Sequence, residues 1–496
     1  MQKKQTILVV ASLLVVVLSV TLAYFTAQII GKGKIVTINS ADLKIIFTDS
    51  DGSISGTNIE PGKWNVTKTF TIENKSNETY KYNIVIQDLV NTFVTNGYLQ
   101  YKITSTNGGY NMTEFKDVPK SETATDTILA YSVSISVGVT QSYTVEFKYA
   151  NDESVDQSND MGKKLSGTLF ITEGTEDPNK TLYNQLLVDK STKLTRTDFS
   201  KVLTDNNTNT LYTGVEDSKT VYYFAGNATD NWVKFGKNAS NQDLYWRIIR
   251  TNSDGSVRLL YHGTSTTTTD AYIGTSAFNS SYDNIAYVSY MYGSLGSISS
   301  ARENTNNSTI KTTIDNWYIS NLEAKGYTKY LSTTAVYCND RSISSDSINF
   351  GAFTRLGTNK TPSYDCAATE DKFTVDTSTG NGKLTYPIAL MTADEVSFAG
   401  GLYGANTPTW YYYNSVNGSS TGSKFWWLLS PLDSSTSGSS MFIVRGSSNP
   451  GRLNYNYVYS NNGVRPALSL KSCVKYSSGD GSANEPYTIK ETETGC

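Results

Sequence analysis

The chain has 496 residues, more than a single hydrophobic core usually accommodates, so we expect two or three domains. Lysine and arginine total 42 against 45 aspartate and glutamate, a formal net charge of −3, so there is no basic surplus and no nucleic-acid partner is expected. One histidine, His262, excludes metal sites that need two or more histidine ligands, and we expect neither a metal nor a cofactor.

An uncharged apolar segment, residues 7–27, follows Lys3 and Lys4. At about 1.5 Å per residue, a helix of this length spans the ~30 Å hydrocarbon core of a membrane, and it exceeds the apolar part of an ordinary signal peptide. We expect residues 1–30 to be a signal peptide or a membrane anchor of an exported, extracellular or cell-surface protein. If the segment is not cleaved, it binds the membrane. Because Lys32 and Lys34 follow it, the flanking charges leave its orientation open.

Short runs of alternating apolar and polar residues fill residues 34–175, and clusters of Gly, Asn, Asp and Ser separate them. This alternation predicts an antiparallel β-sandwich of about seven strands. The clearest runs are residues 43–47, 67–72, 82–87, 142–148 and 167–172.

The start of the chain resembles the TasA and camelysin family of exported biofilm-fibre proteins. The resemblance rests on Leu22-Ala-Tyr-Phe25, a strand near Leu43, Ile59-Glu-Pro-Gly62 and Thr69-Phe-Thr-Ile-Glu-Asn-Lys75. It covers residues 1 to about 175. It implies cleavage near Ala23 and a soluble or fibre-assembled product, whereas without cleavage the segment is a permanent anchor.

Residues 176–204 are expected to link two domains. The sequence GTEDPN at 174–179 has the composition of a linker. The amphipathic stretch 182–188 predicts one short helix, which we interpret as a spacer or domain cap.

Strands and helices alternate with long polar loops in the second half. Residues 244–250 and 257–261 flank the turn residues 252–255, Asn-Ser-Asp-Gly, and this pattern predicts a β-hairpin. Apolar residues then recur at helical spacing after Ser308, a good N-cap, so we expect a helix packed against a sheet. The apolar face consists of Ile310, Ile314, Trp317, Tyr318 and Leu322.

A second, shorter helix is predicted after Thr392. Thr392 and Glu395 have the spacing of a capping box, and Gly400 and Gly401 end the pattern. Asp394 and Glu395 are adjacent and point apart, so we interpret them as acids that favour the first turn rather than as a catalytic pair.

All four cysteines lie in the second half, without a CxxC spacing. In an exported chain an even number favours disulfides. Cys338–Cys366 and Cys473–Cys496 close the shortest loops and are the favoured pairing of three. Buried free thiols are the alternative.

Eight blocks in the second half together resemble a family of uncharacterised exported bacterial proteins. The closing Trp427-Leu-Leu-Ser-Pro431 and Gly463-Val-Arg-Pro466 are similar to the end of formylglycine-generating-enzyme-like domains. The resemblance implies an α+β C-type-lectin-like domain, which we assign to residues 205–496. The other blocks are Tyr245-Trp-Arg-Ile-Ile249, Tyr290-Met-Tyr-Gly293, Asn307-Ser-Thr-Ile-Lys311, Asn316-Trp-Tyr318, Cys338-Asn-Asp-Arg341 and Met391-Thr-Ala-Asp-Glu395.

Enzyme activity does not follow from this resemblance. The oxidase members use a reactive cysteine pair within the domain, whereas Cys473 and Cys496 lie beyond the Gly-Val-Arg block. The GxSxG match at 418–422 follows His262, the reverse of hydrolase order, and reads as a loop. We expect no catalytic residue. An oxidase- or hydrolase-type enzyme of the same fold is one alternative, and a biofilm-matrix or pilus-like structural subunit is another.

Residues 447–463 resemble the variable segment of diversity-generating retroelement proteins, which diversify the end of a lectin-type domain. Asn, Tyr and Ser occupy 11 of these 17 positions, and they make good contact residues. We expect Leu453 and Val458 to point inward as scaffold, while the rest bind a protein or glycan ligand on another cell, a phage or a host surface. A plain solvated loop is the alternative. The candidate ligand-binding residues are Ser447, Ser448, Asn449, Arg452, Asn454, Tyr455, Asn456, Tyr457, Tyr459, Ser460, Asn461 and Asn462.

Two further features have a structural and a functional interpretation. The aromatic residues 410–413, 426 and 427 are favoured as core, with a sugar-stacking platform as the alternative. Arg465 is favoured as a brace for a carboxylate or carbonyls, with an anion clamp as the alternative.

Overall fold

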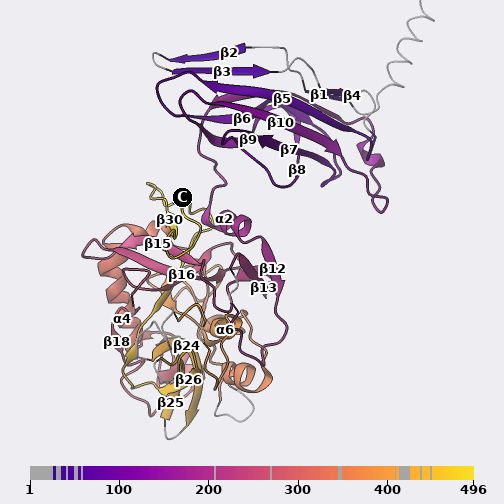
Figure 1. Cartoon of the computed structure of the whole chain (residues 1–496). Helices are drawn as coiled ribbons and strands as arrows, with labels where there is room; N and C mark the ends of the chain where they lie inside the picture. Colours follow the sequence, from indigo (N-terminus) through magenta and orange to yellow (C-terminus); the bar gives the residue numbers. More distant parts are fainter. Residues whose placement is uncertain are drawn as a thin grey trace, which may run out of the picture. The chain divides into compact units, whose positions relative to one another are not determined.

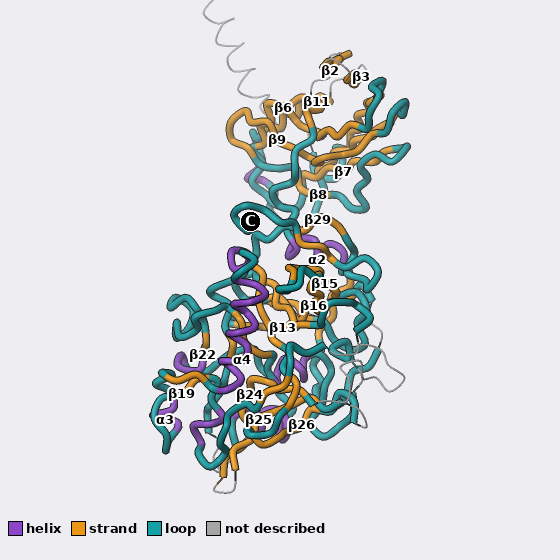
Figure 2. The backbone as a smooth tube through the Cα atoms, turned by 90° about the vertical axis from the view of Figure 1, so that its left-hand side faces the viewer, coloured by secondary structure: helices purple, strands orange, loops and turns teal. Residues whose placement is uncertain are grey.

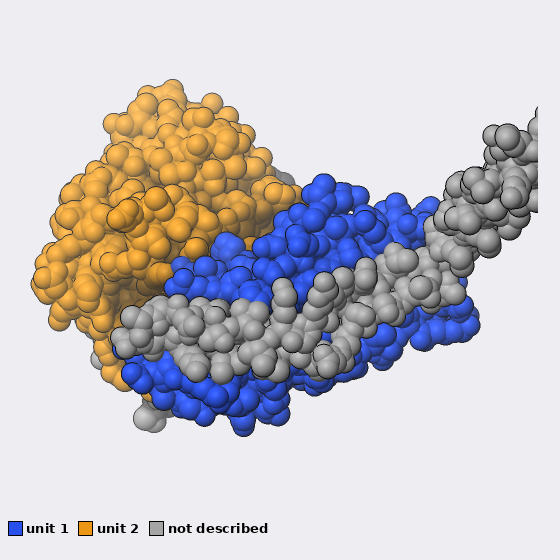
Figure 3. Space-filling view, turned by 90° about the horizontal axis from the view of Figure 1, so that it is seen from above, with its two compact units in different colours: residues 1–178 blue, residues 179–496 orange. Residues whose placement is uncertain are grey.

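The chain divides into two compact units, Met1–Pro178 and Asn179–Cys496 (Figure 3). In the part of the chain that the structure describes, no helix is long and apolar enough to cross a membrane. Residues 7–25 of the predicted export segment lie outside that part, and its last two residues, Thr26 and Ala27, begin a strand. The computed structural model describes residues 26–29, 35–40, 43–49, 54–56, 60–205, 208–268, 271–343, 349–407, 409–412, 425–435, 438–446 and 449–496.

Unit 1 consists of two β-sheets (Figure 1). The first has the order β4-β1-β11-β6-β9, with β1 Thr26–Ile29, β4 Ile54–Gly56, β6 Tyr80–Asn91, β9 Ser121–Ile135 and β11 Lys164–Glu173. The second has the order β2-β3-β5-β10-β7-β8, with β2 Ile35–Ser40, β3 Leu43–Asp49, β5 Asn65–Asn74, β7 Leu99–Ser105, β8 Lys116–Asp117 and β10 Thr140–Tyr149. One short 3-10 helix, η1 (Ser158–Asp160), precedes β11.

Strand alternation builds the core of unit 1. In β10 the side chains of Tyr143, Val145 and Phe147 are buried, whereas those of Thr144 and Glu146 between them are partly exposed. The inward residues of both sheets form one hydrophobic cluster, so the two sheets make a sandwich. The prediction of about seven antiparallel strands was incomplete: eleven strands are described, and β1 runs parallel to β11. Several of the additional strands have only two to four residues, too few for alternation to identify them.

Unit 2 contains a ten-stranded sheet and a five-stranded sheet. The larger sheet has the path β12-β13-β14-β16-β15-β30-β29, and β17, β28 and β23 continue from β16. Its strands are β12 Thr192–Thr195, β13 Thr210–Glu216, β14 Lys219–Tyr223, β15 Trp232–Lys237, β16 Asp243–Thr251, β17 Val257–Tyr261, β23 Ile388–Leu390, β28 Pro466–Leu470, β29 Tyr476–Ser478 and β30 Tyr487–Ile489.

The five-stranded sheet has the order β18-β27-β24-β25-β26. Within unit 2, β24, β25 and β26 lie at the end opposite α2 and β15 (Figures 1 and 2). The strands are β18 Thr275–Ser276, β24 Trp426–Ser435, β25 Gly438–Val444, β26 Leu453–Tyr457 and β27 Asn462–Gly463; the pairs β19–β20 (Met291–Tyr292, Asn306–Asn307) and β21–β22 (Tyr337–Cys338, Lys372–Phe373) stand apart.

Helices are short and few among the described residues, which confirms a mainly β chain. The helix predicted at 182–188 is α2, and its Leu182 and Leu186 are buried in the core of unit 2. The α-helices are α2 Leu182–Asp189, α3 Ile298–Ala301, α4 Thr309–Tyr318, α5 Gly351–Phe353 and α6 Ala393–Phe398; the other turns are η2 Ile285–Val288, η3 Ile319–Glu323, η4 Tyr327–Tyr330, η5 Thr354–Asn359 and η6 Thr369–Asp371.

The local predictions for unit 2 are confirmed. Strands β16 and β17 form the expected hairpin, and Gly255 in its turn has a φ of 79°. The Ser308 side chain caps α4 by accepting a hydrogen bond from the Lys311 N–H. Thr392 and Glu395 form the capping box of α6.

Candidate functional site

The predicted ligand-binding segment forms β26 and the loop that follows it. Strand β26 lies at the edge of the five-stranded sheet and pairs with β25. Ser447 and Ser448 lie outside the described residues. The side chains of Leu453 and Val458 are completely buried, as predicted for scaffold positions.

Three tyrosines of this segment point outward. Tyr455, Tyr457 and Tyr459 expose 41%, 41% and 49% of their surface. Tyr455 and Tyr457 are two residues apart on one strand, so they lie on the same side of it. The rings of Tyr457 and Tyr459 are nearly parallel, with centroids 5.8 Å apart and planes 12° apart.

A fourth tyrosine from a distant part of the chain joins them. The Tyr282 ring, 42% exposed, lies 4.8 Å from the ring of Tyr459. Among residues 60–496, wherever the structure describes the side chain, these four are the only aromatic residues with more than 40% of their surface exposed. We call Tyr282, Tyr455, Tyr457 and Tyr459 the tyrosine surface. Tyr282 could not be identified from the sequence, because only the tertiary fold brings it beside the loop after β26.

The outer edge of β26 is closed by its own asparagines. The Arg445 N–H donates to the Arg452 carbonyl, and the Val458 N–H donates to the Ser439 carbonyl. These two bonds identify Arg445–Arg452 and Ser439–Val458 as hydrogen-bonded pairs of the antiparallel ladder between β25 and β26. Because such pairs alternate, the N–H groups of Tyr455 and Tyr457 point away from β25. The side-chain oxygens of Asn454 and Asn456 accept these N–H groups at 2.8 and 3.0 Å. Two backbone donors of β26 that an added strand would need are therefore already occupied.

Three polar residues of the segment bind one another. The Asn456 amide donates to the side-chain oxygen of Asn462 at 3.3 Å, and the Ser460 hydroxyl donates to Asn456 at 3.0 Å. Asn462 is buried. These contacts hold the loop in shape, so we assign Asn456, Ser460 and Asn462 to support of the surface rather than to direct ligand contact. Asn461 is exposed beside them.

The other aromatic candidates belong to the core. Trp410, Trp426 and Trp427 are completely buried, as are Tyr411 and, to within 2%, Tyr412. The Trp427 indole N–H donates to the Ser276 carbonyl at 2.8 Å. This burial removes the sugar-stacking alternative for these five side chains. Residue 413 of the same cluster and the GxSxG match at 418–422 lie outside the described residues.

Arg465 braces backbone carbonyls, as the favoured interpretation had it. Its guanidinium donates to the carbonyls of Tyr261 and Tyr411 at 3.2 and 2.9 Å and lies 3.3 Å from Nδ1 of His262. Burial lowers the pKa of Arg465 to about 10. Burial, together with the charges of Arg465 and Arg247, also holds the pKa of His262 well below its ordinary value. His262 is therefore neutral and enclosed, in packing contact with Trp232.

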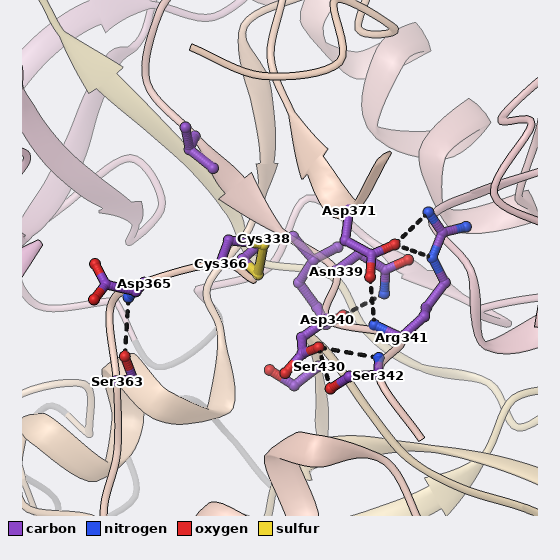
Figure 4. The surroundings of a disulfide bond; sticks show 12 residues. Cys338, Asn339, Asp340, Arg341, Ser342, Ser363, Asp365, Cys366, Asp371 and Ser430 are labelled. Carbon is purple, nitrogen blue, oxygen red and sulfur yellow. Dashed lines mark hydrogen bonds and ion pairs between the residues drawn. A yellow bond between two sulfur atoms is a disulfide. The ribbon is translucent and has the colours of Figure 1, made fainter. Parts of the chain in front are cut away.

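Both disulfides have the pairing that loop length favours, Cys338–Cys366 and Cys473–Cys496. The first joins the segment that carries Asp340 and Arg341 to the segment that carries Asp365 (Figure 4). Arg341 forms an ion pair with Asp371 at 2.7 Å beside it. No cysteine thiol is free.

A buried ionic network lies beside this disulfide. Glu395 contacts both Arg250 at 3.0 Å and Arg258 at 2.7 Å. Burial alone would raise the pKa of Glu395, but the charges of Arg258 and Arg250 outweigh it and hold that pKa below its ordinary value. The prediction that Glu395 serves only the helix terminus was therefore incomplete, because its arginine partners come from β16 and β17, far away in the sequence.

The second acid of α6 also has an arginine partner. Arg355 contacts Asp394 through two hydrogen bonds of 3.0 Å and Asp340 at 2.6 Å. Arginines and acids of the network line a cavity of about 10 Å³, close to the size of a single water molecule. Since these acids are paired with arginine, the network has the character of a structural core.

No group of three or more His, Cys, Asp and Glu side chains in the described ranges is arranged to hold a metal ion. Comparison of the chain with family models, with curated proteins and with solved structures found no match. The resemblances to TasA-like and lectin-type proteins therefore stay predictions.

Proposed function

We propose that this chain is an exported binding protein displayed at a cell surface. In this proposal unit 2 is a lectin-type head that holds a protein or glycan ligand, and the sandwich of unit 1 is its stalk or assembly module. Binding requires no chemistry at the site. It uses aromatic and amide groups that the fold holds in place before the ligand arrives.

The tyrosine surface carries the proposal. Exposed aromatic rings are concentrated at one place in the described residues, and three of the four rings come from the Asn/Tyr/Ser-rich segment. Tyrosines are frequent among interface residues whose loss costs about 2 kcal/mol or more of binding. Buried Leu453 and Val458 anchor β26 at its two ends.

Export is supported by the cysteines. The structure holds two disulfides and no free thiol, and disulfides persist mainly in oxidising compartments outside the cytosol. The apolar segment at 7–27 points the same way. The two disulfides and the apolar segment are both consistent with a binding domain that functions outside the cell.

Diversification of the binding segment is part of the proposal. Leu453 and Val458 are buried whereas Tyr455, Tyr457 and Tyr459 are exposed, so the exposed positions can vary without disturbing the core. The DNA flanking the gene tests this. We expect a reverse-transcriptase gene and a near-copy of the codons for about residues 427–470 that differs chiefly at adenines. If the reverse-transcriptase gene and the near-copy are both absent, the segment is not diversified, and the proposal of ligand binding is then tested by adhesion alone.

Assembly into a fibre by unit 1 is the structural alternative. The edge strand β9 pairs with β6 through four register irregularities and carries the exposed charges Glu122 and Asp126. Irregular, charged edges are features that oppose edge-to-edge pairing. The described edge of β9 thus favours a stalk over a polymerising subunit.

An adhesion assay tests the proposed function. Fluorescent beads that carry the full chain are mixed with bacterial cells, phage particles or host cells, and bound beads are counted. We expect adhesion to at least one of these surfaces and its loss with Tyr457→Ala and Tyr459→Ala combined. Adhesion to none of them, or equal adhesion of the double variant, would contradict the proposal.

A further inference from the structure

Arg445 and Arg452 lie opposite each other where β25 and β26 meet their connecting turn. The Arg445 N–H donates to the Arg452 carbonyl at 3.0 Å, one position beyond the last register pair, Val444 and Leu453. Residues directly opposite in an antiparallel pair project on the same face, with Cβ atoms about 4.5–5.5 Å apart. Two positive charges are therefore placed side by side.

These two arginines differ from the other eight in the chain. Five of the others contact acids at 2.6–3.0 Å, and three donate to carbonyl oxygens of the core. Among the described residues, neither Arg445 nor Arg452 forms an ion pair, and the Nε of each is enclosed without a hydrogen-bond partner. The five are Arg250, Arg258, Arg302, Arg341 and Arg355; the three are Arg196, Arg247 and Arg465.

Neutral contacts hold both guanidinium groups in place. Arg445 lies over the Phe425 ring at 4.8 Å from its centroid. The Nη1 of Arg452 lies 3.4 Å from the side-chain oxygen of Asn449. These contacts order the two groups but leave their charges uncompensated. Like charges directly opposite destabilise a strand pair, and an anion between them reverses that effect.

We infer that Arg445 and Arg452 form an oxyanion subsite, and that the ligand of the head is an acidic saccharide. Guanidinium groups bind carboxylate and sulfate oxygens through paired hydrogen bonds. The subsite adjoins the start of β26, because Arg452 directly precedes Leu453 and lies three residues, or about 10 Å along an extended chain, before Tyr455. Burial, Tyr455 and Asp433 raise the pKa of Tyr403, whereas Arg452 lowers it, so Tyr455 and Arg452 both lie near the Tyr403 hydroxyl.

The closed edge of β26 favours a saccharide over an acidic peptide. A peptide that adds to a sheet edge needs outward N–H groups, and those of Tyr455 and Tyr457 are already bound by Asn454 and Asn456. A sugar needs no main-chain partner and stacks on exposed rings. This inference rests on the proposed function, because it specifies the charge and the chemical class of the ligand that the head is proposed to bind.

Binding of the full chain to four immobilised polymers tests the inference. The probes are polygalacturonate, dextran sulfate, neutral dextran and polyglutamate. We expect binding to an acidic polysaccharide, at least tenfold weaker binding by Arg445→Gln or Arg452→Gln, and no change beyond twofold for Lys383→Gln, which removes an exposed charge elsewhere. Higher salt should reduce the binding.

Three outcomes would overturn the inference. They are equal binding by the arginine variants and the Lys383 variant, equal binding of neutral dextran, and stronger binding of polyglutamate, which would assign the site to acidic proteins. Melting temperatures separate binding from folding: relief of the like-charge pair should leave each variant at least as stable as the parent. In the same assay the Tyr457→Ala, Tyr459→Ala variant tests the proposed function separately, because loss there with intact binding by the arginine variants defeats only the anion subsite.

Discussion

The side-chain oxygen of Asn456 accepts a hydrogen bond from the backbone N–H of Tyr457 at 3.0 Å. Asn454 does the same for Tyr455 at 2.8 Å. The alternation of Asn and Tyr along β26 thus has two consequences. The tyrosines project outward, and the asparagines occupy the backbone N–H donors that would otherwise attract another strand.

Loss of an edge asparagine should promote self-association. In Asn454→Ala combined with Asn456→Ala, the N–H groups of Tyr455 and Tyr457 lose their acceptors and become available to a second molecule. Sedimentation velocity should show concentration-dependent oligomers. Asn454→Asp combined with Asn456→Asp keeps the acceptor oxygens and should stay monomeric. If the alanine variant sediments like the aspartate variant, the asparagines do not protect the edge.

Glu395→Gln should destabilise unit 2 strongly. The substitution leaves Arg258 buried without its acid and removes one of the two acids of Arg250. Removal of one partner from a buried pair costs about 3–5 kcal/mol. Urea unfolding followed by tryptophan fluorescence measures it, since six of the seven tryptophans belong to unit 2.

Lys201→Gln is the matched control. The Lys201–Asp198 pair is exposed, at 3.5 Å, so its loss should leave the free energy of unfolding essentially unchanged. If Glu395→Gln and Lys201→Gln lowered the free energy of unfolding by similar amounts, the buried network would contribute no more to stability than an exposed ion pair.

His262 should make unit 2 less stable in mild acid. Its pKa is held well below the ordinary value by burial and by Arg465 and Arg247, so the folded unit stays neutral there while the unfolded chain takes up a proton below about pH 6.5. The contribution of His262 to stability is therefore fully present above that pH and is lost progressively as the pH falls beneath it.

Because the chain has one histidine, His262→Gln should remove this slope between pH 7 and pH 5. Urea unfolding at each pH provides the measurement, and the Lys201→Gln variant should keep the parental slope. A slope that persists in His262→Gln would assign the effect to other groups.

Opening the Cys338–Cys366 bond should lower stability without abolishing the fold. The bond closes a loop of 28 residues, for which chain entropy predicts about 3–4 kcal/mol. Cys338→Ser combined with Cys366→Ser should lower the melting temperature. A reducing agent should lower the melting temperature of the parent by more than these substitutions do, because it also opens Cys473–Cys496. If neither the substitutions nor the reducing agent changed the melting temperature, the two bonds would not form in the protein as it is purified.

Features that depend on neighbouring residues were predictable from the sequence. The Asn252–Gly255 turn, the Ser308 cap and the Thr392–Glu395 capping box each need only a few consecutive residues. The inward positions of Leu453 and Val458 followed from the pattern of their own segment. The shortest loops also gave the observed disulfide pairing.

Features that join distant segments were not predictable in this way. Tyr282 reaches the tyrosine surface through the fold, and Glu395 finds Arg250 and Arg258 on another element. In the sequence, Tyr282 lies in a polar stretch and Glu395 has the spacing of a capping-box residue, so neither position indicated a distant partner. The parallel pairing of β1 with β11 likewise joins the two ends of unit 1, and β1 has only four residues.

The dissociation constant of the strongest ligand found by adhesion, measured for the parent and for Tyr457→Ala, Tyr459→Ala, tests the central claim most directly. Both rings are exposed, so the melting temperature should stay unchanged while binding weakens at least tenfold. Leu295→Ala, which truncates another exposed apolar side chain, should bind like the parent. Equal affinity of the parent and a fully folded double variant would contradict a head that binds through its tyrosine surface.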